Sequence, residues 1–304
     1  MSNRKTLLLS KLGVRLSILL MLTSVSYAET PAFNASVSYD LLKRQCDFGP
    51  RNPGSFGHQK CLEWMVAYFR SLGLIPIEQK FDIIDPRSGV KLHLTNIIVP
   101  IGLGETPPVM LCAHWDTRSV ADRDRDPKLR DQPISGANDG ASGVAVLMEI
   151  ARVLVADPPS RPVLIALWDG EDIGRENHPD EYAAGSRYWA RHQTPEPPAE
   201  AILLDMVGDS DLRFPVEWFS ERYSPALRSD IWQIAEQIGV SAFTDEQGPA
   251  VEDDHVPLIR AGIPSIDIID FDYPYWHTQQ DTPDKCSPES LGQTGRVLLA
   301  YIYR

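Results

Sequence analysis

The sequence predicts an α/β fold: a doubly wound, mixed and mainly parallel sheet with helices on both faces. Apolar runs of strand length alternate along the chain with stretches of helical periodicity, and acidic residues or a histidine directly follow several of the runs. Alternation of this kind is typical of a parallel sheet that helices cover on both sides. Such sheets carry their chemistry beyond the carboxyl ends of the strands, where these polar residues stand.

The elements are expected in the following order. Two helices, over residues 39–45 and 58–72, flank the Gly- and Pro-rich loop 49–55. Strands are expected over residues 95–101, 108–113, 162–168, 201–206 and 265–269. Helical periodicity recurs over residues 144–156, 182–191, 226–238 and 288–301. Residues 121–133 are highly charged and lack periodicity, which predicts a solvated loop.

The composition fits one globular domain over residues 29–304. The 304-residue chain is 43% hydrophobic and 23% charged, which supplies enough apolar residues for a sizeable core. With 42 acidic against 29 basic side chains, its formal charge of −13 repels phosphate backbones, so we expect no nucleic-acid partner. We expect the domain to be a monomer.

Residues 1–28 have the pattern of a secretory signal peptide. A basic start precedes an apolar run, and small residues stand before a cleavage point at Ala28. An N-terminal helix or membrane anchor is the alternative, although Arg15 shortens the apolar run. Cleavage after Ala28 would give a secreted or periplasmic protein without a stable membrane anchor.

Four cysteines follow, and an oxidising compartment permits disulfides without revealing their pairing. The spacing of Cys46, Cys61, Cys112 and Cys286 matches no zinc knuckle and leaves three full pairings open. Cys112 lies inside an apolar strand, where we expect a buried free thiol.

Imidazole and carboxylate groups are predicted to converge at one edge of the sheet. They follow apolar runs or lie in two loops: His114, Asp139, Glu171, Asp172, Asp205 and His277. Taken singly, each could be a turn residue, a helix cap or a surface side chain. Taken together they favour a cation, because adjacent acids cannot both be buried without a cation or a proton. Histidine and carboxylate ligands without cysteine suit zinc, or a similar first-row ion, better than calcium or magnesium.

Six ordered motifs resemble those of the zinc-dependent exopeptidase superfamily, which includes bacterial aminopeptidases and glutaminyl-peptide cyclotransferases. The motifs are AHWDT (113–117), GANDGASG (136–143), WDGED (168–172), LLDMVG (203–208), DDHVPLIRAGIP (253–264) and WHT (276–278). The resemblance runs from Gly49 to the carboxyl end. It implies the doubly wound fold, a zinc cofactor, and peptide or protein N-termini as substrates.

The resemblance implies roles for individual residues. Asp139, Asp172 and His277 match the positions that hold the zinc ion of cyclases, and Glu171 matches the general acid/base. Asp172 is shorter than the Glu common at its position in animal cyclases. In both enzyme types zinc polarises a carbonyl while a carboxylate transfers a proton, so the nucleophile decides the product.

The two enzyme types use further positions differently. In two-metal aminopeptidases, the positions of His114 and Asp205 complete a second metal site bridged by that of Asp139, so a second ion stays open here. In cyclases the position of Asp205 is instead a catalytic hydrogen-bonding acid. Asp254 is expected to support its catalytic role, and Asp253 to line the substrate pocket.

Three features favour a glutaminyl-peptide cyclotransferase, which converts N-terminal Gln to pyroglutamate and releases ammonia. Trp276 stands before the expected ligand His277 and is predicted to form a wall of the substrate pocket. The paired acids before His255 and the motif WDGED resemble cyclases more than aminopeptidases. A zinc aminopeptidase of the same family is the alternative enzyme. A non-catalytic peptide-binding module with this fold is the alternative from another class.

Overall fold

The computed structural model describes residues 30–102, 104 and 106–304, so the predicted signal peptide lies outside the described residues. The strands are β1 (Ile77–Ile84), β2 (Lys91–Ile101), β3 (Val109–His114), β4 (Val163–Trp168), β5 (Glu200–Asp205), β6 (Phe214–Val216), β7 (Phe243–Gln247) and β8 (Ser265–Ile269). The helices are α1 (Ala35–Cys46), α2 (Phe56–Ser71), α3 (Ala141–Ala156), α4 (Ala184–His192), α5 (Trp218–Tyr223), α6 (Pro225–Gln237), α7 (His255–Arg260) and α8 (Pro288–Ile302), with short 3-10 turns η1 (Pro179–Glu181) and η2 (Pro283–Lys285). Within these ranges no helix combines the length and the apolar character needed to cross a membrane.

The central sheet is mixed and mainly parallel, as predicted. Its strand order is β1-β2-β4-β3-β5-β8, and β6 pairs with β7 in a second sheet. β3 pairs in parallel with β4 and β5, and β5 with β8, whereas the β1–β2 and β2–β4 pairs are antiparallel. The parallel strands were predictable because they are buried and form continuous apolar runs. The edge strand β1 was missed because most of its residues are at least partly exposed.

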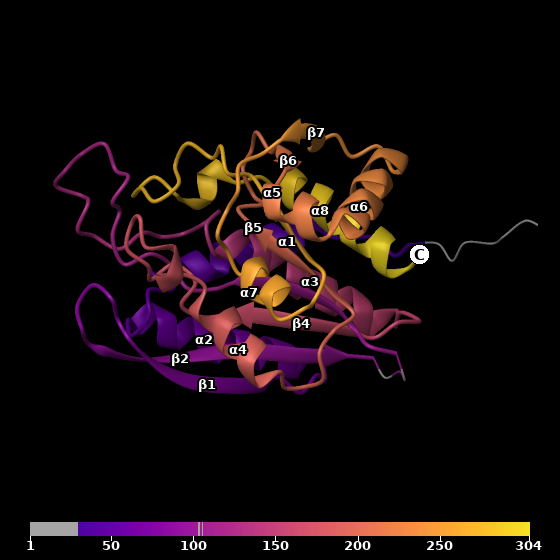
Figure 1. The fold of residues 1–304 in the computed structure, drawn as a ribbon, viewed down its shortest axis with the longest axis horizontal. Coiled ribbons are helices and arrows are strands. Elements are labelled where there is room, and N and C mark those ends of the chain that lie inside the picture. The colour runs from indigo at the N-terminus through magenta and orange to yellow at the C-terminus, as the bar shows by residue number, and fades with distance from the viewer. Residues whose placement is uncertain (1–29, 103, 105) are drawn as a thin grey trace, which may run out of the picture.

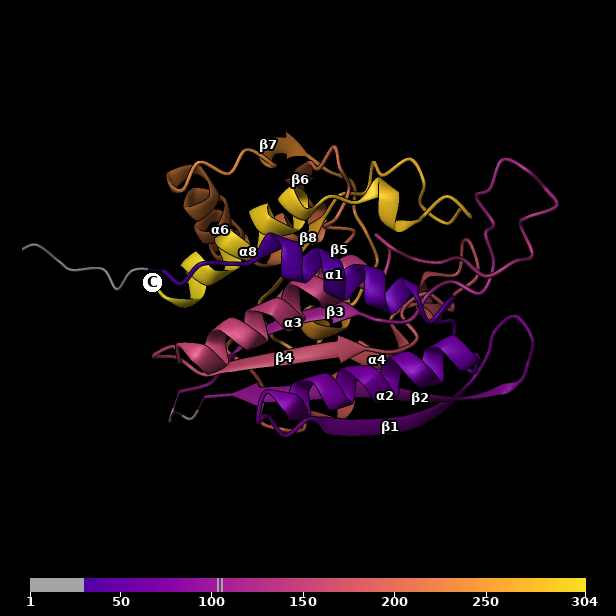
Figure 2. The same cartoon turned by 180° about the vertical axis from the view of Figure 1, so that it is seen from behind.

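Alternate residues of the central strands enter two apolar cores. Val109 and Leu111 of β3 belong to the core that α1, α2, α3 and α8 cover, whereas Met110 and Cys112 belong to the core beneath α4 and α7 (Figures 1 and 2). This alternation follows from the two-residue period of a strand. All four cysteines lie among the described residues and are free thiols, and Cys112 is fully buried as predicted.

The parallel strands end at one edge of the sheet. The connections that follow β3, β4, β5 and β8 gather at this edge, on the left of Figure 1. Brief connections join the opposite ends of several elements, so the irregular backbone of the molecule is concentrated where the sequence predicted the site. The fold thus brings together side chains that are far apart in the sequence.

Candidate active site

Several predicted site residues lie at or just after the carboxyl ends of strands. His114 is the last residue of β3 and Asp205 the last of β5, while Glu171 and Asp172 follow β4 after a two-residue turn. His277 lies in the connection after β8 and has a positive φ of 56°. Such a backbone conformation is uncommon outside glycine, so surrounding contacts must hold it.

Asp139 is positioned by its backbone, in the turn that opens α3. Gly140 has a φ of +102°, and a Cβ at this position would lie 2.4 Å from the carbonyl oxygen of Asp116. The Asp281 carboxylate accepts hydrogen bonds from the backbone N–H groups of Asn138 (2.8 Å) and Asp139 (3.2 Å). A glycine is therefore required beside Asp139, and the Asp139 carboxylate has a fixed direction.

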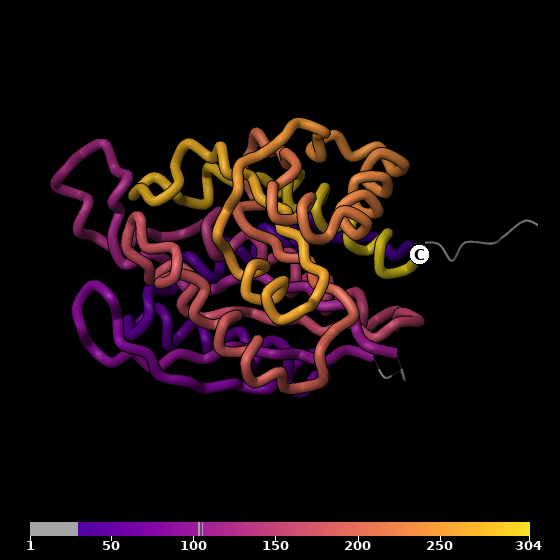
Figure 3. Tube along the Cα trace, viewed as in Figure 1, coloured from indigo at the N-terminus to yellow at the C-terminus, as the bar shows by residue number. Residues whose placement is uncertain are grey.

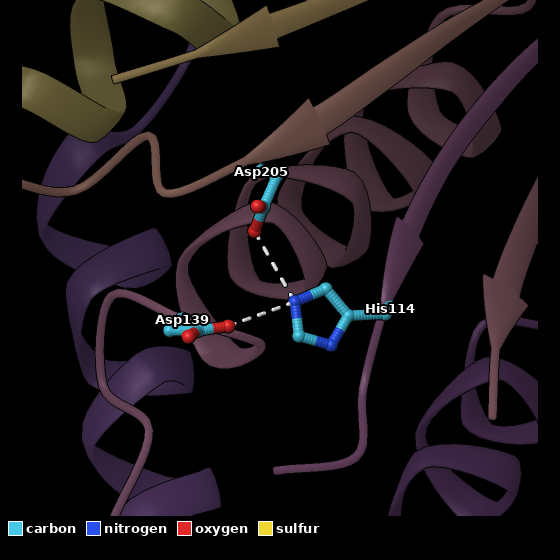
Figure 4. A group of neighbouring side chains, drawn as sticks. All are labelled: His114, Asp139 and Asp205. Atoms are coloured by element: carbon cyan, nitrogen blue, oxygen red, sulfur yellow. Dashed lines mark hydrogen bonds and ion pairs between the residues drawn. The ribbon is translucent and has the colours of Figure 1, made fainter. Parts of the chain in front are cut away.

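One group consists of the buried His114 and Asp139 and the partly buried Asp205 (Figure 4). Nε2 of His114 lies 3.1 Å from Oδ1 of Asp139 and 3.2 Å from Oδ1 of Asp205. Burial would lower the pKa of His114, but hydrogen bonds with carboxylates, including these two, outweigh it and raise the pKa well above the usual value. The imidazole Nε2 thus pairs with both acids, whereas the buried Nδ1 of His114 has no hydrogen-bond partner among the described residues.

A second buried group consists of Asp139, Asp172 and His277. Nε2 of His277 lies 3.5 Å from Oδ2 of Asp139 and 3.3 Å from Oδ1 of Asp172. The buried Oδ2 atoms of both aspartates accept no hydrogen bond from any described residue. Two carboxylates and an imidazole within 4.8 Å of one another can hold a divalent metal, and the chemistry of this donor set fits zinc.

The adjacent acids of the WDGED motif have pKa values that are shifted in opposite directions. Burial and the nearby Asp253 carboxylate raise the pKa of Glu171 well above its ordinary value. Burial acts in the same direction on Asp172, but His277 and Arg118 outweigh it and lower the pKa of Asp172 to about 2. The surroundings thus move the two pKa values apart, which suits proton transfer at Glu171 and cation binding at Asp172.

A cavity of about 450 Å³ opens over these groups. Glu171, Asp253 and Trp276 line it, and the last two are the residues that the sequence analysis assigned to a substrate pocket. Phe271 also lines the cavity and its ring centroid lies 5.0 Å from that of Trp276. Tyr182, which follows the acid pair in the sequence, also lines the cavity, although no motif indicated it. Aromatic side chains therefore contribute to a pocket that otherwise carries charged groups.

Asp254 occupies a different position from its neighbour. Its side chain is fully buried and is not among the residues that line the cavity. Burial and Asp253 raise the pKa of Asp254 well above its usual value. Behind it, His255 lies 3.3 Å (Nε2) from Oε2 of Glu217 and 3.9 Å (Nδ1) from Oδ2 of Asp267. Acidic side chains thus continue from the cavity wall into the core.

Sequence reasoning missed two charged residues that touch the second group. Arg118 is 1% exposed and its Nη1 lies 2.7 Å from Oδ1 of Asp172, and Asp122 lies beside His277. The sequence indicated these two residues only weakly. Arg118 follows the same strand as His114, but Asp122 belongs to the segment that was predicted to be a solvated loop. That prediction holds for residues 125–128, which are exposed, and is wrong for the buried Asp124.

The family of the chain follows from comparison with known proteins. The family model of peptidase family M28 matches residues 96–302. The chain belongs to peptidase family M28. This confirms the resemblance to the zinc exopeptidases and the predicted fold.

Both enzyme types considered above occur among the M28 relatives. The glutaminyl-peptide cyclotransferase-like protein of Mus musculus is 27% identical over 281 residues, covering 83% of this chain and 71% of the relative. Aminopeptidase YwaD of Bacillus subtilis is 31% identical over 184 residues, covering 55% of this chain and 37% of the relative. The structure of Bacteroides thetaiotaomicron glutaminyl cyclase is 36% identical, with a TM-score of 0.87, and the match covers 91% of this chain and 99% of the cyclase.

Proposed function

We propose that this protein is a glutaminyl-peptide cyclotransferase that converts N-terminal Gln of peptides or proteins to pyroglutamate. One observation carries the proposal. In the group of Asp139, Asp172 and His277, the buried Oδ2 atoms of both aspartates have no hydrogen-bond partner among the described residues, and they lie beneath an aromatic-lined cavity. These oxygens favour a metal at this group, beside a substrate pocket. The similarity to a bacterial glutaminyl cyclase over 91% of the chain supports it.

The reaction joins two ends of one substrate residue. A zinc ion held by Asp139, Asp172 and His277 would polarise the side-chain amide carbonyl of the Gln. The substrate's α-amine nitrogen bonds to this carbonyl carbon, and the bond from the carbon to the amide nitrogen breaks. Glu171, on the cavity wall, accepts the proton of the attacking amine and returns a proton to the leaving nitrogen, which departs as ammonia.

Other residues of the cavity orient the substrate. Trp276 and Phe271 exclude water from the Gln side chain and hold it folded back toward the α-amine. Asp205 and Asp253 also line the cavity, and burial raises the pKa of both. A carboxyl group kept protonated can donate a hydrogen bond to the amide oxygen, and Asp254 supports this pair from behind.

A zinc aminopeptidase is the second candidate function. His114, Asp139 and Asp205 have ligand atoms within 4.8 Å of one another, which is also compatible with a second metal. With two metals, water would attack a peptide carbonyl and release the N-terminal residue. A non-catalytic peptide-binding module would form neither product.

The test uses the zinc-loaded protein, one Gln-initiated peptide and one Leu-initiated peptide. We expect mass spectrometry to show loss of ammonia from the Gln peptide and an unchanged Leu peptide. Residue release that exceeds ammonia release would refute the cyclase and support the aminopeptidase. Binding of either peptide without any product would support the non-catalytic module.

The proposal includes export and a monomeric state. The pattern of residues 1–28 supports cleavage after Ala28, and the mature protein would act outside the cytoplasm. Expression of the full chain in a bacterial host should yield a periplasmic or secreted protein whose N-terminal residue is Glu29. Sedimentation of this material should give the mass of one chain. Retention of residues 1–28 in the membrane fraction would contradict export.

A further inference from the structure

The segment 118–124 packs against the loop that carries His277, at the carboxyl edge of the sheet (Figure 3). The backbone N–H of Arg123 donates to the carbonyl oxygen of His277 (3.2 Å), and the Arg123 guanidinium lies 5.2 Å from the ring centroid of Trp276. Gln279 donates from its backbone N–H to Asp124 Oδ2 (3.0 Å). These contacts hold the positive φ of His277 in place.

Gln279 also contacts residues 132 and 133, at the other end of the charged loop over residues 121–133. Its Nε2 group donates to the carbonyl oxygens of Gln132 (3.2 Å) and Pro133 (2.9 Å). One side chain and its backbone therefore connect the His277 loop to both ends of residues 125–131. The segment 118–124 is fixed relative to the candidate metal group, although the sequence predicts a solvated loop over residues 121–133.

The side chain of Arg118 connects two acids in this arrangement. Its Nη1 donates to Oδ1 of Asp172 (2.7 Å), while Nε and Nη2 donate to the two oxygens of Asp122 (2.9 and 2.6 Å). The fork geometry of a guanidinium suits this double contact, which a lysine ammonium cannot reproduce. Oδ2 of Asp172 accepts no hydrogen bond from the described residues and would be available to a metal, while Arg118 holds Oδ1.

Asp122 lies beside His277, the other candidate ligand in this arrangement. Its Oδ1 lies 3.4 Å from Nδ1 of His277, on the side of the ring away from Asp139 and Asp172. A carboxylate at Nδ1 favours the tautomer that carries its proton there. Nε2 then presents its lone pair to the group of Asp139 and Asp172, and such partners commonly orient metal-bound imidazoles.

We propose that Arg118 and Asp122 form a positioning pair that joins Asp172 and His277 into one pre-oriented half of the metal site. The inference rests on the proposed zinc site and adds the residues that set its geometry. Both residues also line the cavity, and we assign them a positioning rather than a catalytic role. Both act through the ligands that they hold.

The experiment measures the zinc dissociation constant by competition with a chromophoric chelator, without substrate. Asp122→Ala should weaken zinc binding by about 10- to 100-fold, the usual effect of losing such a partner. Arg118→Lys keeps the charge but loses the fork, and should weaken binding in the same direction. The double variant should be no weaker than the weaker single variant, because the pair acts as one unit. Asp131→Ala, at an exposed position of the charged loop, is the control and should bind like the wild type.

The outcomes separate this inference from the cyclase proposal. Asp122→Ala with a dissociation constant within about twofold of wild type would overturn the positioning pair, whatever the product of the enzyme. Additive losses in the double variant would also overturn it, since independent structural defects add. Asp122→Asn, which keeps an acceptor oxygen, should lie between wild type and Asp122→Ala. Weakened zinc binding in an enzyme that releases amino acids instead of ammonia would support the pair and refute the cyclase.

Discussion

Neighbouring carboxyl groups in this protein differ in pKa because their surroundings differ. Burial and other acids raise the pKa of Glu171, whereas His277 and Arg118 lower that of Asp172. Hydrogen bonds hold the backbone of both residues in place, because the Asp116 carboxylate accepts from the N–H groups of Glu171 (3.0 Å) and Asp172 (3.3 Å). One residue can therefore transfer protons while the next holds a cation.

Glu171→Gln is expected to keep its metal and lose at least about a hundredfold in rate. The amide is similar in size to the acid but cannot transfer the proton, and removal of a general acid/base has effects of this order. Metal content and turnover are measured on the same preparation, with Asp172→Asn for comparison, which should lose metal as well. A Glu171→Gln enzyme that is depleted of metal but active after zinc is restored would reverse the two roles.

Trp276→Ala is expected to retain its metal and fold while pyroglutamate formation falls by about a hundredfold. The indole lines the cavity next to His277, and loss of a well-oriented attack geometry has an effect of this size. Trp218→Ala, at a side chain that is 40% exposed, is the control and should have normal turnover. Pyroglutamate formation at the wild-type rate in Trp276→Ala would contradict the pocket role.

Asp267→Asn is expected to raise thermal stability relative to the wild type, and more so at pH 8 than at pH 4. Burial and Asp253 raise the pKa of Asp267 well above its usual value. Between the unfolded and folded pKa values only the unfolded state releases the proton, so wild-type stability falls as pH rises. The amide removes this loss. The difference in unfolding midpoint between variant and wild type is measured against pH, with the exposed Asp245→Asn as control. A difference that shrinks as pH rises would contradict the neutral acid.

Helix α3 approaches the sheet closely at a glycine. A Cβ on Gly143 would lie 2.4 Å from the carbonyl oxygen of Leu204 and 2.9 Å from the Cβ of Ala113. The helix begins directly after the turn that carries Asp139. Close packing of α3 on β3 and β5 therefore sets the position of the candidate ligand Asp139 relative to the sheet.

Gly143→Ala should destabilise the protein by about 1–3 kcal/mol, the range for overpacking, despite the better helix propensity of alanine. The new methyl group must push α3 away from backbone that cannot yield. Gly292→Ala in α8 is the matched control, because its Cβ would meet the Ala35 side chain at 3.0 Å, with no backbone contact. Denaturant unfolding of both variants provides the measurement. Equal stability of the two would show that α3 moves freely.

Predictability also depends on the element. The strands β3, β4, β5 and β8 were predicted because both faces are buried, and Asp205 and Asp172 were chosen as candidates because one ends β5 and the other follows β4 within four residues. The edge strand β1 lacked an apolar run. Arg118 and Asp122 were missed because their roles depend on contacts with residues 172 and 277, which no local pattern encodes.

At the scale of the molecule, the candidate metal group joins three connections. Asp139 precedes α3, Asp172 follows β4 and His277 follows β8. In a chain with a formal charge of −13, a divalent cation at this point offsets local repulsion between carboxylates. Metal binding is thus expected to contribute to the stability of the whole fold.

Chelation should lower the unfolding midpoint, and added zinc should restore it. A ligand present at a hundred times its dissociation constant stabilises the native state by about 2.7 kcal/mol. His277→Ala is the matched control, because without this ligand the midpoint should respond little to chelator or zinc. Scanning calorimetry with and without chelator provides the measurement. An identical midpoint for wild-type protein in both conditions would contradict a metal at this site.

Because Gln279 binds the chain at both ends of residues 125–131, the number of residues between these two attachment points can vary. Residues 125–128 are exposed between the tied position Asp124 and the carbonyl groups of Gln132 and Pro133. The entropy of closing a loop grows slowly with its length, so extra residues between fixed ends add little free energy. Residues 125–128 can therefore be lengthened, or cut by a protease, while the chain on either side stays bound to the His277 loop. This is a place where an affinity tag or a fused domain can be inserted.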